Sequence, residues 1–320
     1  MALTDTQAMQ ELAGRVVLFA VPAEEFVELE YRARLRAAGQ IEFLGGKPEL
    51  IRLGEFDDVD MAMMVHSTAN TPGRRIRVGG STNGFLAKTV RFAGRPSHAG
   101  ARPDLGVNAL NAAALAIMGI NAQRETFRDE DAIRVHHILT RGGEVVNVVP
   151  DDVRMELFVR GRTLDAIVDT AAKVDRALLG GAAMVGAEAA ITNQSGYLPL
   201  LPDQMLTAVF RENAVALLGA DGLVAAGHSA ASTDMGDLSH LMPALHPFAG
   251  GFDGVNHGER FRIADPEMAY LVPAKAMAMT VVDLLADGAA VARRVLETFQ
   301  PRMTRAQYLH YLRTGEVQGT

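Results

Sequence analysis

Residues 151–160 read DDVRMELFVR, and this stretch decides the fold of the middle of the chain. Apolar side chains occupy every second position of it, and charged side chains occupy most of the positions between them. Such an alternation is typical of a strand that buries one face, because successive side chains point to opposite sides of a sheet. The sequence predicts a strand over residues 152–160, with Val153, Met155, Leu157 and Val159 on one face and Arg154, Glu156, Phe158 and Arg160 on the other.

The segments around this strand complete a small domain. Three further strands are predicted, at residues 85–92, 132–139 and 187–193. Two helices are predicted, at residues 106–121 and 163–179, and Thr163 is the expected N-cap of the second. The order β-α-β-β-α-β matches the split βαβ sandwich. We therefore expect a small, ferredoxin-like α+β domain at residues 81–195.

The flanking segments predict one larger domain that the small domain interrupts. Residues 15–21 and 60–65 are apolar runs, which are typical of strands buried on both faces of a parallel sheet. Helices are predicted at residues 28–38, 47–53, 205–218 and 266–285. The predicted fold class is α/β: a discontinuous domain (1–80 and 196–320) with a mostly parallel sheet and helices on both faces, interrupted by residues 81–195.

The composition limits the class of protein. The 320 residues are 48% hydrophobic and 22% charged, which is ordinary for a globular chain. The net charge is −7 without a dense lysine and arginine cluster, so no nucleic acid is expected as a partner. The longest apolar runs, such as residues 109–120, are too short to span a bilayer, so no membrane is expected either. The absence of cysteine excludes disulfides, thiolate metal ligands and a cysteine nucleophile in this sequence. The first residues have no signal-peptide pattern, so a cytoplasmic location is expected.

Two adjacent acids, Glu24 and Glu25, follow the first apolar run in VLFAVPAEE. Adjacent carboxylates can cap the helix that follows and complement its dipole. The carboxyl end of a parallel strand is also where α/β sheets place their chemistry. At such a position one carboxylate can hold a metal ion while the other takes a proton from the water bound to that ion.

Three histidines lie at predicted strand ends or in loops. His66 follows the strand predicted at 60–65, where a lone histidine is either structural or a ligand. His257 lies in GVNHGERF, a glycine-containing loop with room for the imidazole to reach a metal ion. Together with Glu25, these two histidines form the set of nitrogen and oxygen ligands that zinc favours. His98, in GRPSHAGARPDLGVNAL, is either a turn histidine or a hydrogen-bond donor to a substrate oxygen.

A serine motif offers a competing chemistry. The sequence AAGHSAAS around Ser229 partly imitates the G-x-S-x-G nucleophile elbow. The second glycine of that motif is missing, and Asp253 precedes His257 by only four residues, so no acid lies at a suitable distance before a late histidine. A serine hydrolase is therefore disfavoured.

Together, these motifs resemble the two-zinc aminoacylase and carboxypeptidase metallohydrolases, in particular the amidohydrolase branch that cleaves N-acyl amino acids and small amide conjugates. The resemblance covers nearly the whole chain, with the motifs in the family's order: PAEE, FDDVDMAMMVH, FAGRPSHAGARPDLGVNAL, GGEVVNVVPDDVRMELFVR, STDMGDLS and GVNHGERF. It implies that residues 1–80 and 196–320 form a metal-binding catalytic domain. Residues 81–195 would then be a lid or dimerisation domain.

The resemblance implies a role for each matching side chain. Glu24 would be the general base, and Glu25, His66 and His257 would be the metal ligands. His98 would hold the oxyanion of the tetrahedral intermediate in the partner subunit's site. Four residues would lie at the substrate: Asn147, Arg160, Thr233 and Asp234. Among these, the planar fork of Arg160 would bind a carboxylate.

The resemblance also implies a cofactor and partners. The expected cofactor is a divalent metal, with zinc first and manganese or cobalt as alternatives. The family holds two ions, whereas one or none is expected here. The expected partners are a small-molecule amide substrate and a second copy of the chain, which would form a homodimer through the lid domain.

The sequence departs from the family in two places. EEFVELEYRARLRAAGQIEFLGGK carries an inserted helical segment where the family has a run of glycines. The family's other metal ligands belong to an upstream His-x-Asp segment, and the fourteen residues before the first predicted strand contain no histidine. Three hypotheses compete: a fragment lacking the family's N-terminal segment, which we favour; a mono-metal amidase; and a catalytically impaired or non-catalytic relative that binds ligands or partners through its lid.

Overall fold

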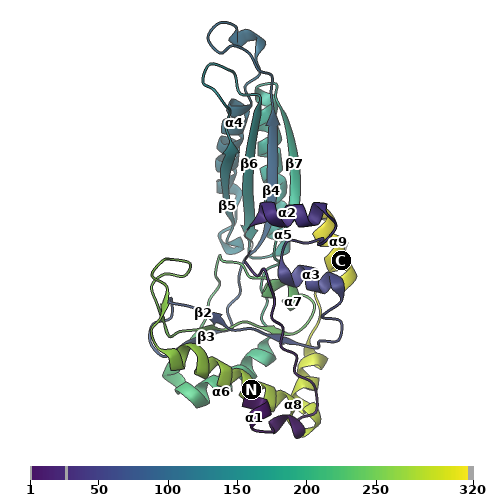
Figure 1. Cartoon of the computed structure of the whole chain (residues 1–320), viewed down its shortest axis with the longest axis vertical. Coiled ribbons are helices and arrows are strands. Elements are labelled where there is room, and N and C mark those ends of the chain that lie inside the picture. The colour runs from purple at the N-terminus through teal and green to yellow at the C-terminus, as the bar shows by residue number, and fades with distance from the viewer. Residues whose placement is uncertain (1, 26–27, 316–320) are drawn as a thin grey trace. The chain divides into compact units, whose positions relative to one another are not determined.

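A computed structural model describes residues 2–25 and 28–315, and these residues form two compact units (Figure 1). Unit 1 contains the residues up to Thr82 together with Leu200–Ser229 and Thr233–Arg305. Unit 2 contains Asn83–Pro199, Ala230–Ser232 and the residues from Ala306 onward. The last helix, α9 (Arg305–Thr314), thus lies mostly in unit 2. The division into a metal-binding domain and a lid domain at the predicted boundaries stays a prediction.

Unit 2 is a four-stranded antiparallel sheet packed against two long helices (Figure 1). The strand order is β5-β6-β4-β7. The strands are β4 (Gly84–Ala93), β5 (Arg134–Arg141), β6 (Asp152–Gly161) and β7 (Glu188–Ser195). The helices are α4 (Ala109–Gln123) and α5 (Leu164–Met184), with short turns at η2 (Pro103–Leu105), η3 (Arg124–Thr126) and η4 (Asp129–Asp131). The element and strand orders are those of a ferredoxin-like sandwich.

The alternation in β6 determines which face of this sheet is buried. Val153, Met155, Leu157 and Val159 are buried in one core with side chains of α4 and α5. The helix α5 begins as predicted, because Thr163 Oγ1 accepts the backbone N–H of Ala166 at 3.2 Å.

Unit 1 is built around short strands. Its largest sheet has the order β2-β10-β3-β8, with β2 (His66–Ser67), β10 (Phe248–Ala249), β3 (Ile76–Val78) and β8 (Leu223–Ala225). The pairs β2–β10 and β3–β8 are parallel, whereas β10–β3 is antiparallel. Two smaller sheets pair β1 (Ala62–Met63) with β9 (Ala244–Leu245) in parallel and β11 (Phe252–Asp253) with β12 (Arg262–Ile263) antiparallel.

Helices surround these strands. They are α1 (Ala2–Asp5), η1 (Ala8–Gln10), α2 (Leu29–Ala37), α3 (Gly46–Leu53), α6 (Gln204–Leu218), η5 (Ala220–Gly222), α7 (Met235–Ser239), η6 (Glu267–Leu271) and α8 (Val272–Thr298). The core contains buried side chains from α6, α8 and the strands, among them Ile76, Val78, Leu206, Phe210, Leu245, Met268 and Leu284. Together, the two units bear out the α/β fold class.

The helix predicted at 266–285 is found and is followed by a second helical segment. Non-helical backbone angles at residues 286–289 break it before a further segment ends at Thr298. In the part of the chain that the structure describes, Glu267–Thr298 is the single helix long and apolar enough to cross a membrane. Met268, Val272 and Leu284 are buried in the core of unit 1, so this apolar face is used within the fold.

The strand predicted at residues 15–21 is wrong. The run is irregular, and Leu18 is 94% exposed. A strand needs a neighbour whose backbone groups it can pair with, and none of the strands in the described residues pairs with this run. The strand predicted at 60–65 is reduced to the two residues of β1. Glu24 and Glu25 therefore do not follow a buried strand.

Candidate functional site

The PAEE segment lies against the beginning of helix α3 in unit 1. Ala23 has a φ of 61°, and its carbonyl accepts the backbone N–H of Gly46 at 3.1 Å. A Cβ on Gly46 would lie 1.9 Å from the carbonyl oxygen of Pro22, so only a glycine permits this approach. The glycine before Lys47 thus fixes the position of the segment that carries Glu24 and Glu25.

The two adjacent acids have different surroundings. Glu24 is half-buried, and its Oε1 accepts the hydroxyl hydrogen of the buried Thr233 at 3.3 Å. The side chain of Glu25 is 57% exposed. Thr233 therefore contacts the predicted base in the structure, and its predicted contact with substrate stays a prediction.

A buried ion pair lies beside Glu24. Lys47 Nζ is 2.6 Å from Asp234 Oδ1, and the two side chains are 5% and 0% exposed. The ammonium also lies 3.6 Å from Met64 Sδ. The pair joins the first turn of α3 to the residue before α7, which are 187 positions apart in the sequence.

The environment of Asp234 changes its acidity. Burial, together with the nearby charge of Glu24, raises the pKa of Asp234 to about 6, against the opposing effects of the Lys47 ammonium and the Lys47 backbone N–H. Asp234 was predicted to line the substrate site. Its carboxylate is fully buried and paired with Lys47, and its predicted contact with substrate stays a prediction.

His257 lies next to Glu25, as the predicted ligand set requires. Its Nε2 is 3.6 Å from Glu25 Oε1. The neighbouring Asn256 attaches this loop to the β2 segment: its Oδ1 accepts the backbone N–H of Ala69 at 3.0 Å, and its Nδ2 donates to the carbonyl of Ser67 at 3.3 Å. The predicted ligands Glu25 and His257 are therefore adjacent. The loop that carries His257 is hydrogen-bonded to the segment that carries His66, the third predicted ligand.

His66 is held by its own backbone and by two rings. Its Nδ1 is 2.5 Å from the carbonyl oxygen of Ser67, so Nδ1 carries the hydrogen and Nε2 is left with its lone pair. The ring centroids of His246 and Phe248 lie 5.7 and 5.4 Å away. His246 is buried, and burial together with the charges of His66 and Lys47 lowers its pKa to about 3.

Glu25, His66 and His257 are the predicted metal ligands. The tautomer of His66 suits a ligand, because ligating histidines commonly donate their other ring N–H to a carbonyl. The described ranges 2–25 and 28–315 nevertheless contain no group of three or more His, Asp, Glu or Cys side chains that could hold a metal ion. The predicted convergence of Glu25, His66 and His257 on one ion is therefore not found, and these side chains do not by themselves fit a metal.

His98 and Asn147 meet in unit 2. The backbone N–H of Ala99 donates to the carbonyl of Asn147 at 2.9 Å. His98 Nδ1 accepts the backbone N–H groups of Gly100 and Ala101 at 3.2 and 3.1 Å, so its hydrogen is on Nε2. The exposed imidazole thus presents a donor, as an oxyanion-binding role requires.

Arg160 lies over an aromatic surface of unit 2. Its guanidinium carbon is 5.1 Å from the ring centre of Phe85 and 5.6 Å from that of Phe158. Its Nε donates to His136 Nε2 at 3.2 Å, and one terminal nitrogen donates to Ser232 Oγ at 2.8 Å. Burial lowers the pKa of Arg160, and no carboxylate among the described residues pairs with it. The guanidinium of Arg160 is therefore a cation that can bind an anionic group.

The serine motif does not form a nucleophile elbow. An elbow needs a strand, a sharp turn and then a helix, whereas residues 226–232 after β8 are irregular apart from a single bridge between Ser229 and Thr82. His228 Nδ1 contacts Ser81 Oγ at 2.9 Å. The structure therefore supports the sequence argument against Ser229.

Comparison with known proteins finds similarity to peptidases and amide hydrolases. Residues 81–179 match the family model of the peptidase dimerisation domain. Xaa-Arg dipeptidase from Mus musculus is 29% identical over 275 residues, which cover 83% of this chain and 62% of that protein. One of the two subunits of the p-aminobenzoyl-glutamate hydrolase from Escherichia coli (strain K12) is 33% identical over 144 residues, which cover 44% of this chain and 32% of that protein.

A solved structure shares the fold of this chain. A dinuclear metal binding peptidase of the M20 family from Bacillus subtilis superimposes with a TM-score of 0.58 at 21% identity, over 79% of this chain and 69% of that one. The chain is thus similar to peptidases and amide hydrolases, and residues 81–179 are similar to a peptidase dimerisation domain. These matches agree with the resemblance to metallopeptidases and amidohydrolases that the motifs indicated. The chain spans 62% of the length of the mouse relative.

Two residues of the site were missed by the sequence analysis. Lys47 follows two glycines, and no sequence motif marks it as a site residue. In the structure it forms a buried ion pair with Asp234. His246, in LHPF, is both buried and adjacent to His66, and neither of its ring nitrogens has a hydrogen-bond partner among the described residues. A histidine between two apolar runs is the only signal that could have drawn attention to it.

Proposed function

We propose that the chain hydrolyses the amide bond of a small conjugate, an N-acyl amino acid or a dipeptide, with Glu24 as the general base. The observation that carries the proposal is the position of Glu24. Thr233 donates a hydrogen bond to one of its carboxylate oxygens, and the exposed Glu25, its neighbour in the chain, lies 3.6 Å from His257. A fixed carboxylate next to solvent is placed to take a proton from an attacking water.

The chain's own groups account for the proton transfers. The Glu24 carboxylate accepts a proton from the water that attacks the amide carbon, and the carboxylic acid then returns it to the leaving amine. His98 presents its Nε2 hydrogen as a donor for the developing oxyanion, a contribution of about 3 kcal/mol where water is excluded. Dependence on a metal ion, with zinc as the expected ion, is a separate part of the proposal that metal analysis must test.

The substrate class follows from Arg160 and from the relatives. A dipeptide and a p-aminobenzoyl-glutamate each carry a free carboxylate beside the amide, and proteins named for these substrates are relatives of this chain. Arg160 offers its guanidinium without a carboxylate partner in the part of the chain described. A planar guanidinium binds carboxylates through two parallel hydrogen bonds. We therefore propose a substrate with a carboxylate next to the scissile amide.

A homodimer through unit 2 is part of the same proposal. Residues 81–179 match a peptidase dimerisation domain. Light scattering of the purified chain tests this, and a monomer would argue against a contribution of His98 to a partner's site.

The activity test uses the purified chain against a panel of N-acetyl amino acids, dipeptides ending in arginine and p-aminobenzoyl-glutamate. Released amine is measured, and metal content is determined by mass spectrometry on the same sample. We expect turnover of at least one carboxylate-bearing amide and loss of it in Arg160→Gln. A folded dimer without turnover on the panel, with or without added zinc, manganese or cobalt, would instead favour the ligand-binding, dimerising module.

A further inference from the structure

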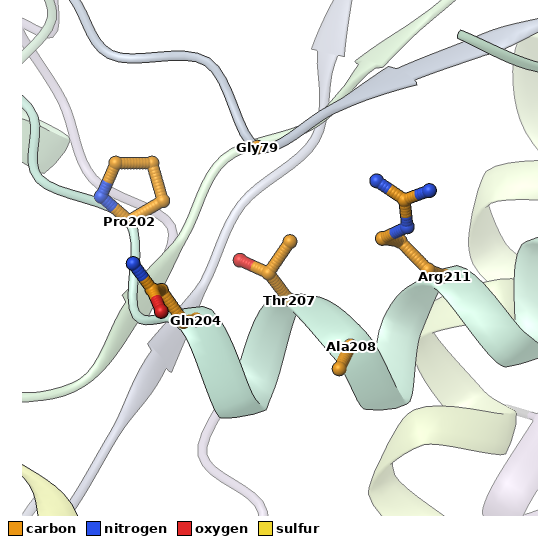
Figure 2. Close-up of a pocket in the computed structure, with 6 residues that line it drawn as sticks. All are labelled: Gly79, Pro202, Gln204, Thr207, Ala208 and Arg211. Carbon is orange, nitrogen blue, oxygen red and sulfur yellow. The ribbon is translucent and has the colours of Figure 1, made fainter. Parts of the chain in front are cut away.

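A cavity of about 260 Å³ lies in unit 1 beside helix α6, away from the Glu24 segment in the sequence (Figure 2). Four of its residues lie on one face of α6, at the spacing that places side chains above one another on a helix. The loop that follows β3 and the turn before α6 close it. Its lining consists of Gly79, Pro202, Gln204, Thr207, Ala208 and Arg211.

The position of the cavity in the sheet favours a ligand site. Strand β3 ends at Val78 and is parallel to β8, so Gly79 is at the carboxyl end of a parallel strand. Open α/β sheets bind ligands at such ends. The cavity also borders the first turns of α6, a helix of 15 residues whose N-terminal end carries partial positive charge.

The charge of the lining favours an anion. Arg211 is the one charged side chain of the six, and no carboxylate lines the cavity. The exposed guanidinium makes neither an ion pair nor a hydrogen bond with any residue that the structure describes. Glu212 follows Arg211 in the helix but forms no ion pair with it, and Asp203 is occupied as the N-cap, where its Oδ1 accepts the backbone N–H of Leu206 at 2.8 Å. A free guanidinium fork matches a carboxylate.

The remaining polar groups favour a hydrogen-bond donor on the ligand. Thr207 Oγ1 donates its hydrogen to the carbonyl of Asp203, so its oxygen is left only as an acceptor. The Gln204 amide has no partner among the described residues and adds a further acceptor. Figure 2 shows Thr207 and Arg211 rising from the same side of α6 toward Gly79.

The small residues set the size of the ligand. Gly79 has a φ of 86°, and a Cβ built on it would lie 3.6 Å from Thr207 Cγ2. Ala208 is exposed on the same helix face. The volume of about 260 Å³ is below the range of about 300–1,000 Å³ of pockets for drug-sized ligands. The site therefore suits a molecule of few heavy atoms.

We propose that this cavity binds a small carboxylic acid that carries an amino or hydroxyl group, with the carboxylate on Arg211 and the donor on Thr207 and Gln204. The binding does not depend on the amide-hydrolase proposal, because none of its residues belongs to that site.

The test is a titration followed by the backbone amide signals of the full chain in NMR spectra. The probes are L-2-aminobutyrate, butyrate and n-butylamine. We expect saturable shifts at Gly79, Thr207 and Ala208 with L-2-aminobutyrate, binding at least threefold weaker for butyrate, and no shifts at these residues with n-butylamine. Arg211→Gln should weaken binding at least tenfold, and Ala208→Phe should abolish it by filling the cavity.

The control is Arg294→Gln, which removes an exposed arginine from α8 and should leave the affinity unchanged. Unshifted signals elsewhere in the spectra confirm that each variant is folded. The proposal is overturned if L-2-aminobutyrate leaves Gly79, Thr207 and Ala208 unshifted, if butyrate binds as tightly, if n-butylamine binds as well, or if Arg211→Gln binds like the wild type.

Discussion

Each unit of the molecule buries one lysine against an aspartate, and the two pairs differ in how completely the charges are satisfied. Lys88 in unit 2 is 0% exposed and lies 2.8 Å from Asp175, whose side chain is 30% exposed. It also donates to Asn193 Oδ1 at 2.7 Å. Lys47 in unit 1 lies 2.6 Å from Asp234, and that carboxylate is 0% exposed.

The difference shows what each pair does for its unit. Lys88 connects β4 to α5 and β7 with two strong acceptors and a partner that reaches water, so it supports the sandwich without a large desolvation cost. Lys47 has one carboxylate and a weakly accepting sulfur, and that carboxylate is fully buried. Burying an ion pair away from water carries a large desolvation cost. Its position beside Glu24 and Thr233 indicates that it holds the site.

The largest expected effect comes from breaking the fully buried pair of Lys47 and Asp234. Lys47→Met keeps the length of the side chain but leaves the buried Asp234 carboxylate without a cation, which should lower the free energy of unfolding by about 3–5 kcal/mol. Lys88→Met should cost about 2 kcal/mol, because water can reach Asp175. Denaturant titration followed by circular dichroism measures both. Equal losses would show that exposure of the aspartate does not separate the two pairs.

The second expected effect is a pH dependence that belongs to Asp234. Its pKa is raised from 3.8 to about 6, so the folded protein binds the proton more tightly than the unfolded chain does. This stabilisation is fully present below pH 4 and is lost as the pH rises through 6. At about 1.4 kcal/mol per unit, the loss is about 3 kcal/mol.

The Asp234→Asn variant isolates this contribution. The unfolding free energy of the wild type should fall relative to that of the variant between pH 4 and 6, with Lys47, Glu24 and His246 present in both. A constant difference between the two proteins over this range would contradict the raised pKa.

The smallest expected effect lies in unit 2, at the first turn of α5. Thr163→Ala removes the hydrogen bond to the backbone N–H of Ala166 and should cost about 1 kcal/mol. Thr126→Ala is the matched control, because that exposed hydroxyl only donates to the carbonyl of Gln123. The control should change the unfolding free energy by less than about 0.5 kcal/mol. Similar losses in the two variants would argue against the cap.

The fold of unit 2 was predictable because its signals are local. The alternation at 152–160 and the cap at Thr163 each act within a few residues, and the structure bears both out. The apolar run at 15–21 shows the limit of such signals. Whether a run becomes a strand depends on a pairing neighbour elsewhere in the chain, and hydrophobicity does not report that neighbour.

The candidate site was only partly predictable for the same reason. Glu25 and His257 were expected together from their motifs and are adjacent. The contact of Lys47 with Asp234 spans 187 positions, and nothing in either segment indicates the other. The burial of Asp234 is likewise a property of packing between α3 and α7.

The central claim is that Glu24 transfers the proton in amide hydrolysis, and the steady-state rate of Glu24→Gln tests it most directly. We predict that kcat falls at least about 100-fold, while the melting temperature and the metal content stay as in the wild type. The matched control Glu28→Gln changes an exposed glutamate four positions away and should keep full activity. Undiminished turnover in Glu24→Gln would contradict the claim, and loss of bound metal in that variant would show that Glu24 and Glu25 have exchanged roles.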